Sequence, residues 1–208
     1  MMGYNRIEAF RKKSGTGRGS AKKTTSCRES FLNTMRLFIA INLSEEVKNA
    51  LRETQSAMFD RGVRGNWSPE ENLHLTRAFI GEYPDARPVL DALDAVTFAP
   101  FTLALDGLGC FDDAWWAGVG ESAPLHALAR RVRRALAEKG IPFDRESFMP
   151  HITLIRRASK APAGIGVPPA LMRVEAFSLL RSDRGRGHMI YTELGSVEAS
   201  QPGGKQDE

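Results

Sequence analysis

The sequence reads His74-Leu-Thr76 at one point and His151-Ile-Thr153 at another. Each tripeptide lies in an apolar run, residues 73–80 and residues 151–155, and each run predicts a β-strand. Side chains two residues apart in a strand lie on the same face, roughly 7 Å apart along the chain. Each motif therefore presents an imidazole and a hydroxyl side by side.

The presence of two such motifs carries the functional prediction. A single histidine on a strand is most often a hydrogen-bonded structural residue. Two copies in similar settings supply two groups that titrate near neutral pH and two hydroxyl donors. This combination suits acid–base chemistry on a small anion such as a phosphate.

Length and composition favour an ordinary globular protein. The chain has 208 residues, 42% of them hydrophobic, which allows one sizeable core or two small lobes. No run approaches the roughly 18 apolar residues of a membrane span, and the N-terminus lacks the apolar segment of a secretory signal. Two cysteines and four scattered histidines form no metal-type cluster in the sequence. We therefore expect a cytoplasmic protein with no metal, no cofactor and no membrane partner.

The net charge of +4 is concentrated at the N-terminus. Residues 1–34 contain eight basic and two acidic residues, so the remainder is slightly acidic. The segment is rich in Gly, Ser and Thr, and we interpret it as a disordered leader. It is either a weak nucleic-acid-binding arm or a leader upstream of a start at Met35. Residues 35–196 then form the domain, and residues 197–208 form a polar tail.

The apolar patterns predict a mixed succession of strands and helices. Strands are predicted at 35–42, 101–105, 115–119, 171–180 and 189–194, and helices from Ser44 to about 59, from Pro84 to about 96, and from Ser122 to about 136. Each half holds strands, a helix and one His-x-Thr strand. The predicted fold is α+β, with two lobes and a central cleft in which the two motifs face each other.

Three segments carry a resemblance to a known family. They are Met-Arg-Leu-Phe-Ile-Ala-Ile-Asn-Leu at 35–43, Trp-Ser-Pro-Glu-Glu-Asn-Leu-His-Leu-Thr at 67–76 followed by Phe79 and Gly81, and Pro-His-Ile-Thr-Leu-Ile-Arg at 150–156. Over residues 35–195 the chain resembles the two-histidine (2H) phosphoesterases, specifically the bacterial and archaeal RNA 2',3'-cyclic phosphodiesterases, also called 2'-5' RNA ligases.

The resemblance implies a function and a role for each matching residue. His74 would be the proton donor and His151 the proton acceptor, while Thr76, Thr153 and Arg156 would bind the phosphate. The implied reaction is metal-free hydrolysis of RNA 2',3'-cyclic phosphate ends to 2'-phosphates. The implied fold is a pseudo-symmetric pair of lobes, each an antiparallel sheet backed by helices. The substrates would be RNA ends or small cyclic nucleotides, and we expect a monomer.

One position departs from the family pattern. The first motif is usually followed by an aliphatic residue, whereas this chain has Arg77. On a regular strand Arg77 would point away from His74 and Thr76, toward the side where helices pack. We expect it to be structural, because an unpaired buried guanidinium would cost several kcal/mol. A bulge that turned it into the cleft would instead make it an additional phosphate ligand.

The remaining aromatic and histidine residues are assigned more modest roles. Phe148 could stack on a base beside the phosphate, with core packing as the alternative. The three tryptophans are expected to be packing residues. His126 is expected on a solvated helix face, and His188 in a hairpin.

Three alternatives to hydrolysis remain open from the sequence. The same site could join RNA ends as a 2'-5' RNA ligase, or act on another cyclic phosphate, such as one derived from ADP-ribose. The chain could also be a nucleotide- or RNA-binding module without catalysis. Binding alone does not require two titratable groups, so retention of both histidines and both threonines favours an enzyme.

Overall fold

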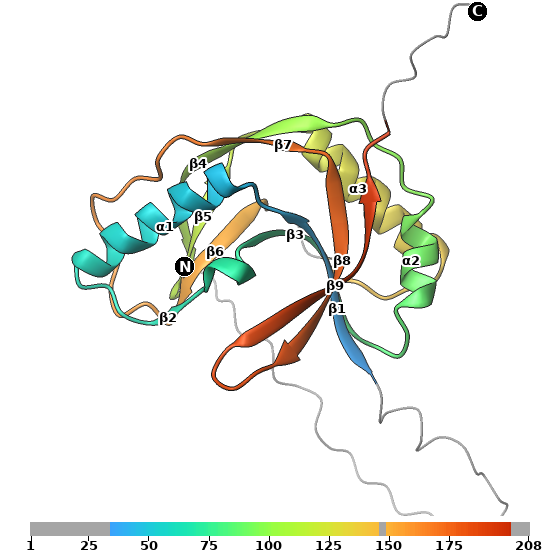
Figure 1. The fold of residues 1–208 in the computed structure, drawn as a ribbon, viewed down its shortest axis with the longest axis horizontal. Helices are drawn as coiled ribbons and strands as arrows, with labels where there is room; N and C mark the ends of the chain where they lie inside the picture. The colour runs from blue at the N-terminus through green and yellow to red at the C-terminus, as the bar shows by residue number, and fades with distance from the viewer. Residues whose placement is uncertain (1–33, 146–148, 201–208) are drawn as a thin grey trace, which may run out of the picture.

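The computed structural model describes residues 34–145 and 149–200. Residues 1–33 of the expected leader, Phe148 and residues 201–208 of the polar tail lie outside the described residues. The described strands are β1 (Met35–Asn42), β2 (Asn66–Trp67), β3 (His74–Tyr83), β4 (Phe101–Phe111), β5 (Ala114–Val119), β6 (His151–Arg156), β7 (Leu171–Val174), β8 (Ala176–Arg184) and β9 (Met189–Glu198) (Figure 1). The described helices are α1 (Glu45–Asp60), the short 3-10 helix η1 (Glu70–Asn72), α2 (Arg87–Leu93) and α3 (Ala123–Glu138).

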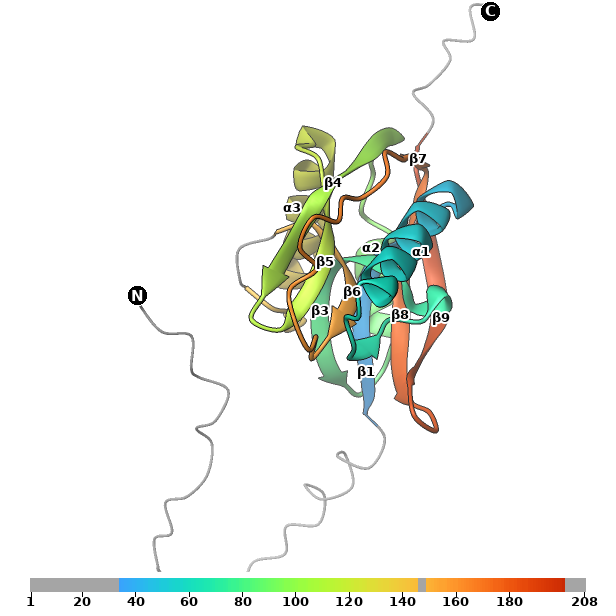
Figure 2. The ribbon, with the colours of Figure 1, turned by 90° about the vertical axis from the view of Figure 1, so that its left-hand side faces the viewer.

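The strands form two antiparallel sheets, each of which contains one His-x-Thr strand. The first sheet has the order β3-β1-β8-β9 and the second has the order β2-β6-β5-β4-β7. The motif strands β3 and β6 belong to different sheets but lie close together in the middle of the molecule (Figure 2). The expected α+β architecture with two antiparallel sheets is confirmed.

Each long helix follows a strand of one sheet and packs against strands of the other sheet. Helix α1 follows β1 of the first sheet but packs against β6 and β7 of the second. Helix α3 follows β5 of the second sheet but packs against β3 and α2. Figure 1 shows α1 on one side of the molecule and α2 with α3 on the other. Because the helices cross over, residues of both sheets share one continuous core.

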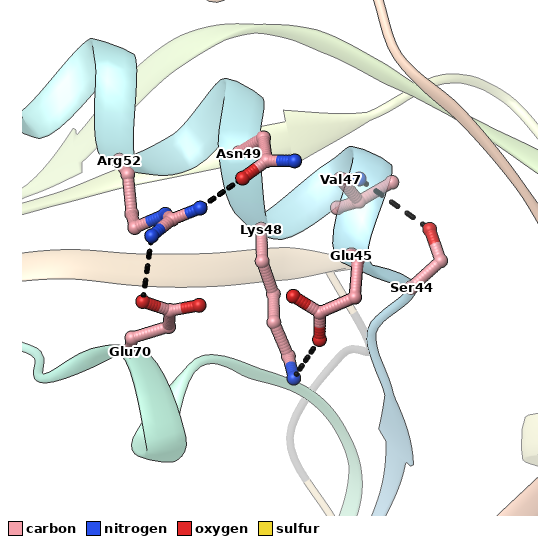
Figure 3. Close-up of polar contacts among 7 residues, drawn as sticks. All are labelled: Ser44, Glu45, Val47, Lys48, Asn49, Arg52 and Glu70. Atoms are coloured by element: carbon pink, nitrogen blue, oxygen red, sulfur yellow. Dashed lines mark hydrogen bonds and ion pairs between the residues drawn. The ribbon is translucent and has the colours of Figure 1, made fainter.

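Helix α1 begins where an N-cap side chain and acidic residues in the sequence predict a helix start. The Ser44 side chain accepts a hydrogen bond from the backbone N–H of Val47 at 3.4 Å (Figure 3). Glu45 and Glu46 occupy the first turn, where the helix dipole favours negative charge. The side chain of Lys48 reaches back to Glu45 at 2.9 Å. The predicted N-cap at Ser44 is therefore confirmed.

Helix α1 also fixes the segment that leads into the first motif. Arg52 forms a 3.2 Å ion pair with Glu70 of η1 (Figure 3). The side-chain amide of Gln55 donates to the backbone carbonyls of Ser68 and Leu154, both at 2.9 Å. One helix thus ties the loop before β3 to the middle of β6, so the approach to the first motif and the strand of the second are anchored to the same element.

Three predicted elements differ from the structure. The strand predicted at 101–105 continues through Gly107 and Gly109 to Phe111 as β4. Residues 171–180 are not one strand, because the chain leaves the second sheet after Val174 and enters the first at Ala176. The apolar residues continue across this break because both strands contribute to the shared core, so the pattern alone does not reveal it. The second helix begins at Arg87 rather than at Pro84, with Pro88 in its first turn. Within residues 34–145 and 149–200, no helix is long and apolar enough to cross a membrane.

Candidate active site

A cleft of about 730 Å³ is lined by residues of both sheets. The five residues predicted to be catalytic or phosphate-binding all line it: His74 and Thr76 from β3, and His151, Thr153 and Arg156 from β6. The two motifs thus share one cleft, as the two-lobed prediction requires. In all, the lining contains three histidines and two arginines and, among the described residues, no carboxylate. Such a lining favours an anionic ligand.

The two histidines are held in the same way. The Nδ1 atom of His74 lies 2.7 Å from the backbone carbonyl oxygen of Asn72, and Nδ1 of His151 lies 2.9 Å from that of Met149. A carbonyl oxygen only accepts, so each Nδ1 must carry a proton and donate. The nitrogen left for substrate chemistry in each ring is therefore Nε2.

The surroundings of both imidazoles favour their neutral form. Burial lowers the pKa of His74 below its usual value, partly offset by the Asn72 carbonyl, and the positive charges of Arg156 and His151 lower it further. Burial likewise lowers the pKa of His151. The hydrogen bond to the Met149 carbonyl partly offsets this effect, and the positive charge of Arg156 lowers the pKa further. Because a charge on His151 disfavours a charge on His74, the pair is suited to hold a single proton.

Aromatic rings flank both histidines. The ring of His74 lies 4.9 Å from Phe38 and 5.2 Å from Tyr191, the latter edge-on. The ring of His151 lies 5.1 Å from Phe111, also edge-on, and 5.9 Å from Trp116. These contacts supply the burial that lowers the two pKa values, and they restrict the orientation of each ring. Trp116, expected to be a packing residue, therefore packs against a candidate catalytic group.

Each motif strand contains a β-bulge directly after its threonine. In β3, Thr76 pairs with Ala40 and Ala78 pairs with Ile39, so Arg77 is the extra residue. In β6, Thr153 pairs with Trp116 and Ile155 pairs with Trp115, which makes Leu154 the extra residue. A bulge shifts the alternation of the side chains by one residue.

The shift explains how Arg156 reaches the cleft. On a regular strand, the third residue after Thr153 would point to the opposite face. Beyond the bulge, Arg156 instead lies on the cleft face, and the corresponding residue of β3, Phe79, does the same. The equivalent bulges therefore place one additional side chain from each strand in the cleft.

The structure settles the position of Arg77. Its side chain is only 1% exposed and donates to the backbone carbonyl of Leu125 at the start of α3. Burial lowers the pKa of Arg77 to about 9, so the guanidinium is still charged at neutral pH. A bulge does occur here, but it leaves Arg77 on the helix side and turns Phe79 into the cleft. The structural interpretation of Arg77 is confirmed.

Several cleft residues were not singled out by the sequence. Arg36, Phe38, Phe79 and Tyr191 all line the cleft. His188, expected only in a hairpin, lies in the connection between β8 and β9 and lines it as well. One signal in the sequence could have identified two of them. Arg36 is a charged residue in the largely apolar run of β1, and Phe38 lies on the same face of that strand. The base-stacking prediction for Phe148 lies outside the described residues.

Asn72 connects the first histidine to the β8–β9 connection. Its backbone carbonyl accepts from His74, while its side-chain amide donates to the carbonyl of Met189 at 2.7 Å. The residue is buried and belongs to η1, which Arg52 of α1 anchors through Glu70. The position of His74 therefore depends on contacts with two distant segments of the chain.

Two sheets that each contribute a His-x-Thr strand to a shared cleft form the architecture of the two-histidine phosphoesterase class. The family model described as the 2'-5' RNA ligase superfamily matches residues 5–186, and the chain belongs to this superfamily.

Named relatives agree with this assignment. The RNA 2',3'-cyclic phosphodiesterase of Thermus thermophilus is 38% identical over 180 residues, which cover 77% of this chain and 88% of that protein. The enzyme of the same name from Geobacillus stearothermophilus is 38% identical over 129 residues, 58% of this chain, and the match spans only 41% of that protein. The crystal structure of Escherichia coli LigT complexed with 3'-AMP aligns with a TM-score of 0.69 at 31% identity, covering 81% of this chain and 99% of that one.

Proposed function

We propose that this protein hydrolyses RNA 2',3'-cyclic phosphate ends to 2'-phosphates, with His74 as the proton donor and His151 as the proton acceptor. The observation that carries the proposal is the pair of imidazoles from facing strands, each held by a backbone carbonyl through Nδ1. Relatives named RNA 2',3'-cyclic phosphodiesterase support the choice of substrate.

The reaction needs two proton transfers on opposite sides of the phosphorus atom. Nε2 of neutral His151 takes a proton from the attacking water as the water oxygen bonds to phosphorus. The bond from phosphorus to the 3'-oxygen breaks, and Nε2 of protonated His74 gives that oxygen a proton. The phosphate stays on the 2'-oxygen. Each positioned acid or base typically contributes about 10² to 10⁴ in rate.

The substrate itself supports the protonation that this mechanism requires. In the free protein both imidazoles favour the neutral form, but a bound phosphate anion favours the charged form of a neighbouring histidine. Thr76, Thr153 and Arg156 donate to the phosphoryl oxygens and stabilise the charge that develops there.

The mechanism uses no metal ion. Among the residues that the structure describes, no group of three His, Cys, Asp or Glu side chains is placed to hold a metal.

The proposal is tested by ³¹P NMR of adenosine 2',3'-cyclic phosphate before and after incubation with the protein. We expect conversion to the 2'-phosphate at an undiminished rate in EDTA, with no conversion by a His74→Gln/His151→Gln variant. A 3'-phosphate product, or turnover by the double variant at the parental rate, would refute the proposal. Formation of a 2'-5' linkage from added RNA with a 5'-hydroxyl would identify the ligase reaction at the same site.

A further inference from the structure

The cleft extends beyond the histidine pair to a second group of polar residues. Arg36, Ser182 and His188 line it, and they come from β1, β8 and the connection that follows β8. Leu37 pairs with Arg181, so Arg36 and Ser182 are the next facing positions of β1 and β8. Ser182 in turn pairs with Tyr191 of β9. Arg36, Ser182 and Tyr191 therefore form a row across three neighbouring strands.

Tyr191 of this row is influenced by the charges of both arginines of the cleft, Arg36 and Arg156. Burial raises the pKa of the Tyr191 phenol, so it stays protonated at neutral pH and remains a hydrogen-bond donor. The charges of Arg156 and Arg36 both act on the same phenol in the opposite direction. Tyr191 therefore lies within electrostatic reach of a cation at the histidine pair and of a second cation away from it.

The position of Arg36 on β1 lies away from the phosphate-binding threonine of β3. The Arg36 guanidinium lies 4.9 Å from the centre of the Phe79 ring, and Phe79 follows Thr76 by three residues of β3. Ala40 pairs with Thr76, and Arg36 lies four residues away from Ala40 along β1, which spans roughly 13 Å. The two cationic ends of the cleft therefore fit a ligand with two separate anionic groups.

We propose that Arg36, Ser182 and His188 form a second anion site, which binds the phosphate on the 5' side of the terminal nucleotide. The inference rests on the proposed function, and it predicts a preference for an RNA end or a 5'-phosphorylated nucleotide over a bare nucleoside cyclic phosphate. Arg36 supplies the positive charge, while Ser182 and His188 supply neighbouring hydrogen-bond donors. The absence of carboxylates among the described cleft residues leaves both anion sites without competing negative charge.

An alternative role for Arg36, as support for an aromatic platform, predicts a different effect of its substitution. Its guanidinium could serve only to hold Phe79 as a platform for a nucleobase. In that case the loss of Arg36 would weaken every substrate with the same base to the same extent, whether or not a 5'-phosphate is present. The second anion site instead predicts an effect that depends on the 5'-phosphate.

The test compares two substrates that differ only at the 5' position, namely adenosine 2',3'-cyclic phosphate with a 5'-hydroxyl and the same compound with a 5'-phosphate. We expect the parental protein to have a kcat/KM about tenfold higher for the 5'-phosphorylated compound, the factor that one charge-assisted hydrogen bond contributes. The ratio should fall close to one in Arg36→Gln and be partly retained in Arg36→Lys. It should also shrink as salt is added.

The matched control is Arg184→Gln, which removes an exposed arginine near the end of β8 that does not line the cleft. This variant should keep the parental ratio. A parental ratio near one, or an unchanged ratio in Arg36→Gln, would overturn the second anion site while leaving the proposed hydrolysis intact. Failure of the parental protein to hydrolyse either compound would overturn the proposed function itself.

Discussion

Arg77 occupies in β3 the place that Leu154 occupies in β6. Each residue directly follows the threonine of a His-x-Thr motif, each is the extra residue of a bulge, and each is buried on the side opposite the cleft. In one strand the position holds an aliphatic side chain, and in the other a guanidinium that donates to the carbonyl of Leu125. The two sheets thus fill equivalent bulge positions with different side chains, one apolar and one charged.

This equivalence predicts how Arg77 responds to substitution. Replacement of a buried ionic group by an apolar side chain of similar size is often neutral, so Arg77→Leu should change the free energy of unfolding by about 1 kcal/mol or less. Arg77→Ala should lower it by about 2–4 kcal/mol, because the truncation leaves a cavity between β3 and α3. Urea unfolding measures both. If Arg77→Leu folds but loses more than tenfold in kcat/KM, Arg77 contributes to the position of the catalytic strand.

Substitution of either histidine should abolish most of the activity without preventing folding. His74→Gln and His151→Gln each remove Nε2 as a proton carrier, and we expect kcat to fall by about 10² to 10⁴ in either variant. Far-UV circular dichroism checks that each protein is folded. The double variant should be little worse than the single ones, because the acid and the base act as a unit. Additive losses in the double variant would contradict the paired mechanism.

The lowered pKa values predict the pH dependence of activity. The kcat/KM profile reports the free protein, in which both imidazoles favour the neutral form. The profile should therefore be bell-shaped with its maximum on the acidic side of neutrality. The kcat profile should lie at higher pH, because the bound phosphate raises the pKa of the nearby imidazole. Coincident kcat and kcat/KM profiles would contradict this electrostatic account.

The same shifts predict a loss of stability in acid. A histidine in the unfolded chain has a pKa near 6.5, so below this pH the unfolded state binds more protons than the folded state. The free energy of unfolding should therefore decrease as the pH falls through about 6.5 toward the lower folded-state pKa values. Urea unfolding at pH 7.5 and pH 5.5 measures the decrease, and it should be smaller in the His74→Gln/His151→Gln variant. An equal decrease in the variant would place its origin elsewhere in the protein.

Gly109 should be intolerant of a side chain because Trp116 lies directly against it. A Cβ atom at Gly109 would overlap the Trp116 ring, which packs against Phe111 and His151. Gly109→Ala should therefore displace the ring, lower the free energy of unfolding by about 1–3 kcal/mol and reduce kcat/KM. Gly120→Ala is the matched control, since its nearest neighbour would be an ordinary 3.8 Å away. Parental stability and activity in Gly109→Ala would show that the tryptophan contact is not required.

Most of the elements could be predicted from the sequence because their signals are local. Ser44 and Ser122 cap α1 and α3, and the apolar periodicities of both helices match their buried faces. The division of residues 171–180 between two sheets could not be predicted, because strands on either side of Glu175 contribute to the same core and leave no gap in the apolar pattern. Similarly, β1 is apolar on both faces, which hides the fact that Phe38 lies in the cleft and Leu37 in the core.

The sequence by itself determined that two imidazole–hydroxyl pairs exist, because i and i+2 share a face in any strand. Only the tertiary structure decided that they share one cleft, since that depends on the pairing of β1, β3, β8 and β9 and on helices that cross between the sheets. It also decided that Arg156 and Phe79 enter the cleft while Arg77 does not. That outcome follows from bulges after Thr76 and Thr153, and a bulge is a mismatch between paired strands that no single strand encodes.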